Sequence, residues 1–100
     1  MILETAIFRI PDGAQARFEV AFQQAQQLLM AADGYLGHQL HRTVERADQY
    51  LLLVRWRDVE AHTEGFRKSE AFGRWRALIG PFFAEPPVVE HHRLIVERSP

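Results

Sequence analysis

The apolar residues follow a strand-like pattern in four stretches of the chain and helical spacing in two regions between them. Residues 2–10 alternate as a strand does. Pro11-Asp12-Gly13 interrupts this strand, and Asp12 is in position to cap a helix. Gly34 follows that helix, where a left-handed residue commonly ends one. The apolar face of the helix consists of residues three and four apart: Phe18, Ala21, Phe22, Ala25, Leu28, Leu29 and Ala32.

The second half of the chain repeats the change from strand to helix. Residues 36–43 and 49–57 are predicted to pair as an antiparallel hairpin across a short polar turn. Asp58 is in position to cap a short helix through Phe66, and Ser69 a second helical segment. Pro86-Pro87 then ends the helical region, and residues 88–96 are predicted to form the last strand.

The predicted order is β-α-β-β-α-β, which is the ferredoxin-like arrangement of an α+β fold. Its four-stranded antiparallel sheet carries both helices on one face, so the other face has no cover within the chain. Residues 50–54 are nevertheless apolar at every position, and neighbouring strand residues point to opposite faces. Both faces are therefore expected to be buried, and a homodimer packed sheet to sheet is the simplest way to bury them.

Size and charge narrow the class of protein. One hundred residues form a single domain, residues 1–100. A net charge of −1 gives no electrostatic footprint for nucleic acid, and no apolar run is long enough for a membrane span. The absence of cysteine excludes disulfides, thiolate nucleophiles and cysteine zinc sites. With no signal peptide at its start, the chain is expected to be cytoplasmic.

The histidines do not form a recognisable metal motif. His38 and His41 are three apart on a predicted strand and point to opposite faces, as do the adjacent His91 and His92. His62 stands alone on its helix, so no metal site is expected. The acidic residues are spread over positions expected at the surface, which leaves no obvious pair of carboxylates for catalysis.

Aromatic residues gather in the second helical region. His62 and Phe66 are four apart, and Phe72, Trp75 and Arg76 follow, while Trp56 ends the apolar face of the third strand. These side chains either belong to the core or line a cavity suited to a flat organic ligand. The predicted sheet also carries many polar residues, including Glu4 and His38, which indicates either a wet dimer interface or a polar patch inside a pocket.

Seven short segments keep a characteristic order and spacing along the chain: Gly34-Tyr35-Leu36-Gly37-His38, Val54-Arg55-Trp56, Glu60-Ala61-His62, Ser69-Glu70-Ala71-Phe72, Trp75-Arg76, Pro81-Phe82-Phe83 and Pro87-Val88-Val89-Glu90-His91. Together they resemble the antibiotic biosynthesis monooxygenase (ABM) family, whose members form dimeric α+β barrels. The resemblance covers nearly the whole chain.

The resemblance implies oxygenation of a small electron-rich aromatic or quinol by O2, with no flavin, haem or metal cofactor. The substrate supplies the electrons, so the protein has to bind it, remove a proton and exclude water. By this resemblance His62 is the candidate base, Trp75 a wall of the site and Arg76 the group that stabilises an anion. The other candidate substrate-binding residues are Tyr35, His38, Trp56, Phe66 and Phe72.

The chain departs from two patterns of that family. Members that degrade haem share an Asn–Trp–His set, whose positions correspond here to Ala6, Phe66 and Arg76, and this chain has no asparagine at all. Haem degradation is therefore not expected. Many quinol-oxidising members carry a histidine three residues before the serine, where this chain has Phe66. His62, one helical turn earlier, is expected to reach the same space.

Two readings of the function remain open at this point. The chain is either a cofactor-independent monooxygenase or a non-catalytic homodimeric protein, ligand-binding or stress-associated, that keeps the fold without the chemistry. A His62→Ala variant separates two roles for that residue, since a catalytic histidine leaves stability nearly unchanged when it is removed. A hydrogen-bonded core histidine costs about 1–3 kcal/mol.

Overall fold

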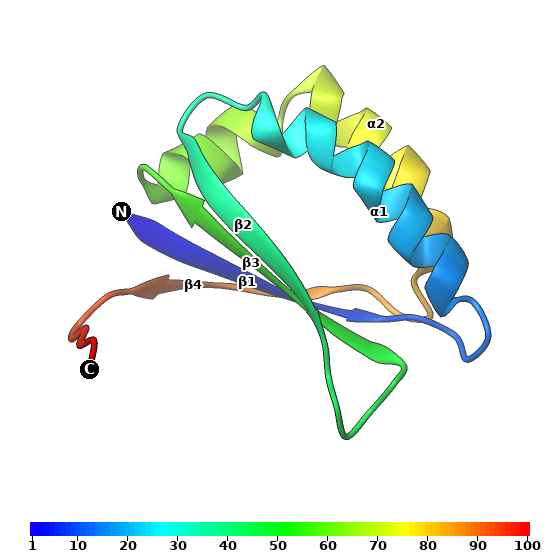
Figure 1. The fold of residues 1–100 in the computed structure, drawn as a ribbon. Coiled ribbons are helices and arrows are strands. Elements are labelled where there is room, and N and C mark those ends of the chain that lie inside the picture. Colours follow the sequence, from blue (N-terminus) through cyan, green and yellow to red (C-terminus); the bar gives the residue numbers. More distant parts are fainter.

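The computed structural model describes residues 1–100 as one sheet with a layer of helices on one face (Figure 1). The strands and helices follow in the order β-α-β-β-α-β, so the predicted α+β ferredoxin-like fold is confirmed. The elements are β1 (Ile2–Arg9), α1 (Gln15–Met30), β2 (Tyr35–Arg42), β3 (Gln49–Trp56), the π-helix η1 (Ala61–Phe66), α2 (Glu70–Ile79), the 3-10 turn η2 (Gly80–Phe82) and β4 (Val88–Arg93). No helix combines the length and the apolar composition needed to cross a bilayer.

The four strands pair antiparallel in the order β2-β3-β1-β4. Every second residue of the central strands faces the helices, and the register places Glu4 beside Val54 and Phe8 beside Tyr50 on that side. Leu51 and Leu53 point to the opposite face, which no element of the chain covers (Figure 1). The core therefore lies between the sheet and the helices, and the other sheet face is open.

The core is built from the apolar faces that the sequence predicts. In α1 the buried residues are Phe18, Phe22, Ala25 and Leu29, four of the seven on the predicted face. They pack against the inner face of β3, where Tyr50, Leu52, Val54 and Trp56 are all at most 2% exposed. Gly34, which precedes β2, has a φ of +86°, and a Cβ there would lie 2.6 Å from that of Ala61. Only glycine fits this close approach without strain.

Two of the three predicted caps are confirmed. Asp58 Oδ1 accepts a hydrogen bond from the backbone N–H of Ala61 at 2.8 Å, and Ser69 Oγ accepts one from Phe72 at 3.2 Å. The cap predicted at Asp12 is wrong, because the helix begins later and its side chain accepts from Gln15 Nε2 instead. The predicted short helix after Asp58 is a π-helix.

The last strand is shorter than predicted and ends at Arg93 rather than at residue 96. The reason is its partner, since Arg93 pairs with Ile2 and β1 has no residue left to pair with Leu94. The next three side chains are accordingly exposed, Leu94 at 55%, Ile95 at 85% and Val96 at 76%.

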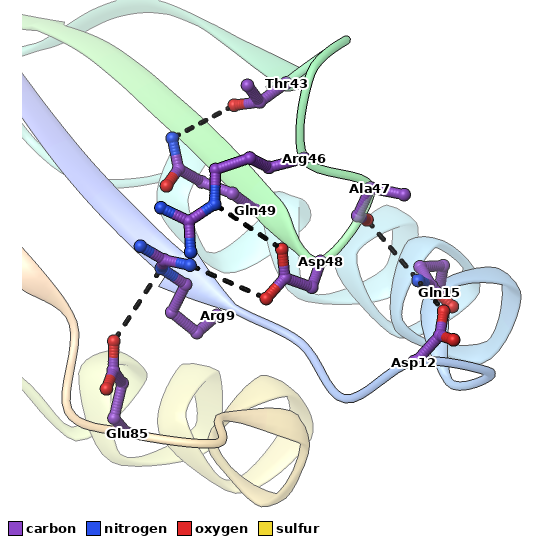
Figure 2. A network of polar contacts seen from close by, with 9 residues as sticks. All are labelled: Arg9, Asp12, Gln15, Thr43, Arg46, Ala47, Asp48, Gln49 and Glu85. Atoms are coloured by element: carbon purple, nitrogen blue, oxygen red, sulfur yellow. Dashed lines mark hydrogen bonds and ion pairs between the residues drawn. The ribbon is translucent and has the colours of Figure 1, made fainter.

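A polar network fastens the β2–β3 turn to the rest of the fold (Figure 2). The guanidinium of Arg9, at the end of β1, lies 3.5 Å from the carboxylate of Asp48 and 3.7 Å from that of Glu85. Gln15 at the start of α1 donates to the carbonyl of Ala47 at 3.4 Å. These contacts join the β2–β3 turn to the end of β1 and to the start of α1, and they join β1 to the segment before β4. They lie at the end of β1 opposite to Glu4.

Candidate functional site

A cavity of about 430 Å³ lies between the helices and the inner face of the sheet, which is within the usual range for small-molecule sites. Ten of its fifteen lining residues are apolar, and aromatic rings from β1, η1, α2 and the segment before β4 form much of the wall. The lining residues are Glu4, Ala6, Phe8, Leu29, Leu52, Val54, His62, Phe66, Arg67, Phe72, Trp75, Arg76, Phe83, Pro87 and Val89.

Glu4 and His62 are the two buried polar residues of the whole chain, and both line this cavity. Glu4 is 6% exposed because it shares the inner face of β1 with Ala6 and Phe8. His62 is 4% exposed and comes from η1, which packs over the end of β3. Burying a carboxylate and an imidazole is costly unless both find polar partners. At this cavity the two side chains meet, so each is a polar partner for the other.

Four side chains from four elements form a chain of polar contacts behind the cavity. Trp56 Nε1 of β3 donates to Glu4 Oε1 at 2.9 Å. The same oxygen lies 3.4 Å from His62 Nε2, and His62 Nδ1 shares a hydrogen bond of 2.8 Å with Nε2 of His91 on β4. The indole of Trp56 also stacks on the imidazole of His62, with centroids 5.3 Å apart. The imidazole is therefore fixed in both position and orientation.

Burial shifts the pKa values of these groups in opposite directions. Burial raises the pKa of Glu4, against the opposing effects of the Trp56 hydrogen bond and the positive charge of Arg67. Burial also lowers the pKa of His62 to about 4, helped by the charges of His91 and Arg67. At neutral pH the imidazole of His62 is thus uncharged, while Glu4 is a stronger base than an ordinary carboxylate.

We expect the protein to lose stability when the pH falls from about 7 to about 5. The pKa of His62 drops from 6.5 to about 4 on folding, so the unfolded chain binds a proton first and this contribution is lost between those two values. The lowered pKa values of His38 and His91 act in the same direction. Glu4, whose pKa is raised on folding, stabilises the fold at low pH instead and offsets part of the loss.

The expected net loss is about 1–2 kcal/mol, measured by urea unfolding at the two pH values. A His62→Gln variant keeps a neutral polar side chain at this position and should lose less stability on acidification than the wild type. An equal loss in both proteins would show that His62 is not the source.

The free energy of unfolding of a His62→Ala variant is expected to be about 1–3 kcal/mol lower than that of the wild type, because the change leaves buried partners without a hydrogen bond. Gln24→Ala is the control, since Gln24 is exposed on α1, away from both the cavity and the open sheet face. It should change stability by no more than about 0.5 kcal/mol. Equal stability of the two variants in denaturant titrations would contradict the hydrogen-bonded role of His62.

The family model described as antibiotic biosynthesis monooxygenase matches residues 1–78 of this chain. The chain belongs to the ABM family. A curated relative from Bacillus subtilis (strain 168), the uncharacterized protein YczJ, is 42% identical over 91 residues, which is 91% of this chain and 96% of the relative.

Solved structures agree with this assignment. A Bordetella bronchiseptica structure assigned to the same family is 41% identical, covers 95% of this chain and 97% of its own, and superposes with a TM-score of 0.92. SnoaB from Streptomyces nogalater, a cofactor-independent oxygenase solved as a variant, is 18% identical with a TM-score of 0.74. That match covers 98% of this chain and 94% of SnoaB, and it shows that the two share a fold.

The structure of this ABM-family protein brings five of the sequence-predicted site residues to one cavity: His62, Phe66, Phe72, Trp75 and Arg76. Phe66 meets Phe72 and Trp75 edge to face, with ring centroids 5.5 and 5.9 Å away, so these rings form one continuous wall. Trp56 is fully buried and does not line the cavity. It lies behind His62 and holds the polar pair in place.

Tyr35 and His38 lie outside this cavity. The hydroxyl of Tyr35 is hydrogen-bonded to His38 Nδ1, and His38 Nε2 contacts Gln26 Oε1 at 2.9 Å. A bulge between Tyr35 and Gly37 places both Tyr35 and His38 on the inner face, although they are three apart. They therefore tie β2 to α1 rather than contribute to the cavity.

Arg67 and His91 were not predicted as site residues, and Glu4 was predicted either at a wet dimer interface or in a polar patch inside a pocket. The structure places Glu4 in the cavity, and its parity matches that of Phe8 and Ile10, which are both core residues. This parity was the available signal. The contact between His62 and His91 depends on how η1 lies over β4, which no local pattern specifies. No group of three or more His, Cys, Asp or Glu side chains, the Glu4–His62–His91 contacts included, is arranged so that it could hold a metal ion.

Proposed function

We propose that this ABM-family protein oxidises a small electron-rich aromatic, such as a quinol or a phenol, with O2. One observation carries the proposal: the chain's two buried polar side chains, a carboxylate and an imidazole, line the same aromatic-walled cavity. An apolar cavity with a few convergent polar groups is typical of a site for a flat organic molecule. The proposed reaction needs no flavin, haem or metal, because the substrate supplies all the electrons.

For a quinol the reaction balances with no other reactant. The quinol loses four electrons and becomes a hydroxyquinone, with one oxygen atom added to its ring. O2 accepts the four electrons, and its second oxygen atom leaves as water together with two hydrogen atoms of the quinol. The step that starts this sequence is removal of a phenolic proton, because the resulting anion gives up an electron more readily than the neutral phenol.

The lining residues fit the three tasks of such a reaction. The Glu4–His62 pair accepts the proton from a hydroxyl group bound next to it. Arg67 and Arg76, both exposed at the rim of the cavity, place positive charge near the anion that forms. The rings of Phe66, Phe72 and Trp75 exclude water from the oxygen intermediates.

Oxygen uptake by chelator-treated, flavin-free protein tests this proposal. The substrates are a panel of hydroquinones, naphthols and anthrones, each corrected for autoxidation. We expect saturable uptake for at least one compound, with one added oxygen atom in the product by mass spectrometry. No uptake, together with measurable binding of the same compounds, would favour a non-catalytic ligand-binding protein instead.

We also propose that the protein is a homodimer joined through the open sheet face. ABM-family members are commonly homodimers that bind small molecules. On this face Ile7 pairs with Leu51, and Leu53 lies next to Thr5, so apolar side chains occupy its centre. The exposed residues from Leu94 to Val96 extend past the sheet and offer further apolar surface. A second copy of the chain packed here covers both the open sheet face and these exposed residues.

A further inference from the structure

The two oxygen atoms of the Glu4 carboxylate have different surroundings. Oε1 accepts the indole N–H of Trp56 at 2.9 Å and lies 3.4 Å from His62 Nε2. Oε2 makes no hydrogen bond within the protein. Because no fully buried side-chain nitrogen or oxygen lacks a partner, Oε2 is not fully buried, and the cavity is the space that the Glu4 side chain lines. One oxygen is held by the protein and the other is presented to a ligand.

His62 is less free than Glu4 to act on a ligand by itself. Its Nδ1 is bonded to His91, and its Nε2 is directed at Glu4. Its low basicity also makes it a weak acceptor at neutral pH. Stacked against Trp56, His62 fixes the carboxylate from one side, as a positioning residue does.

We propose that Glu4 is the group that takes the substrate's hydroxyl proton, through Oε2, and that Trp56 and His62 hold the carboxylate by Oε1. This inference rests on the proposed function and names the accepting atom within the polar pair. Before the reaction begins, the O–H of the bound phenol donates a hydrogen bond to Oε2. This proton moves to Glu4 first, the resulting phenolate then gives up an electron, and Glu4 later returns the proton to the reduced oxygen. No proton has to leave the cavity.

A phenol bound in this way shares one proton with Glu4, which allows a test that needs no turnover. The probe is 4-nitrophenol, studied at pH values above the pKa of the free probe, where it is an anion in solution. Binding next to ionised Glu4 then requires uptake of one proton. The wild-type Kd should rise about tenfold for each pH unit. Calorimetry in two buffers should show about one proton taken up.

Glu4→Gln removes the charge and keeps an oxygen for the indole N–H of Trp56. In this variant the anionic probe faces an amide and the positive rim of Arg67 and Arg76, so it binds without a proton. Its Kd should change less than about twofold per pH unit. Glu45→Gln is the matched control, because Glu45 is exposed in the turn between β2 and β3, away from the cavity and from the open sheet face. It should keep the tenfold dependence.

The charged and titratable groups around Glu4 could also affect this measurement: His62 from η1, His91 and its neighbour His92 from β4, Arg67 after η1, and Arg76 from α2. If proton uptake persists in Glu4→Gln, one of these groups is the acceptor and the inference is wrong. A wild-type Kd that does not depend on pH overturns it without any variant. If none of the proteins binds the probe, the proposed function fails as well.

Discussion

Replacing Trp56 with alanine is expected to lower the free energy of unfolding by about 3–5 kcal/mol. Trp56 is completely buried at the end of β3, and its ring lies against those of His62, Phe66 and Tyr35. Alanine leaves a cavity in a core of only 16 buried residues, which has little other apolar surface to compensate. Denaturant unfolding followed by circular dichroism, at one fixed protein concentration, measures the loss.

Two controls separate the parts of this effect. Val20→Ala removes an apolar side chain that is 62% exposed on α1, and should change stability by less than about 0.5 kcal/mol. Trp56→Phe keeps most of the ring but removes the N–H that bonds Glu4, and should cost about 1–3 kcal/mol. If Trp56→Phe is as stable as the wild type, the indole N–H does not hold the carboxylate.

The fold was predictable because its pattern is local and repeated. Alternation and helical spacing depend on neighbouring residues, so the element order and the buried face of α1 followed from the sequence. The errors lie at the ends of elements, because the length of an element depends there on the segment it pairs with. The last strand stops at Arg93 because β1 begins at Ile2, which is a fact about pairing and not about residues 94–96.

The part of the site that comes from η1 and α2 was predictable, including the polar residues His62 and Arg76, whereas the partner of His62 was not. Phe66, Phe72 and Trp75 follow the helical spacing that brings side chains to one face, so they were expected together. Glu4 and His62 are 58 positions apart and meet through tertiary packing. A buried carboxylate contradicts the general tendency of charged residues toward the surface. Such exceptions are expected at functional sites, where local rules give way to chemistry.

Replacing Leu53 with glutamate is expected to separate the proposed homodimer into folded monomers. Leu53 lies at the centre of the open sheet face, between Thr5 of β1 and Gln39 of β2. In a two-fold symmetric dimer the change occurs twice, and each carboxylate would be buried without a partner. An uncompensated buried charge costs about 3–5 kcal/mol, so the dimer Kd should rise at least about a hundredfold.

Sedimentation equilibrium over a range of protein concentrations measures this shift, with circular dichroism to show that the variant folds. Val44→Glu introduces the same charge at a side chain that is 92% exposed beyond the end of β2, and should leave the dimer intact. The inner face of β3 keeps its contacts in Leu53→Glu, since Leu52 and Val54 point the other way. The monomer should therefore retain the cavity of Glu4 and His62. A Leu53→Glu variant that remains dimeric would show that the interface is not on this face. A wild-type protein that is monomeric would contradict the proposed homodimer itself.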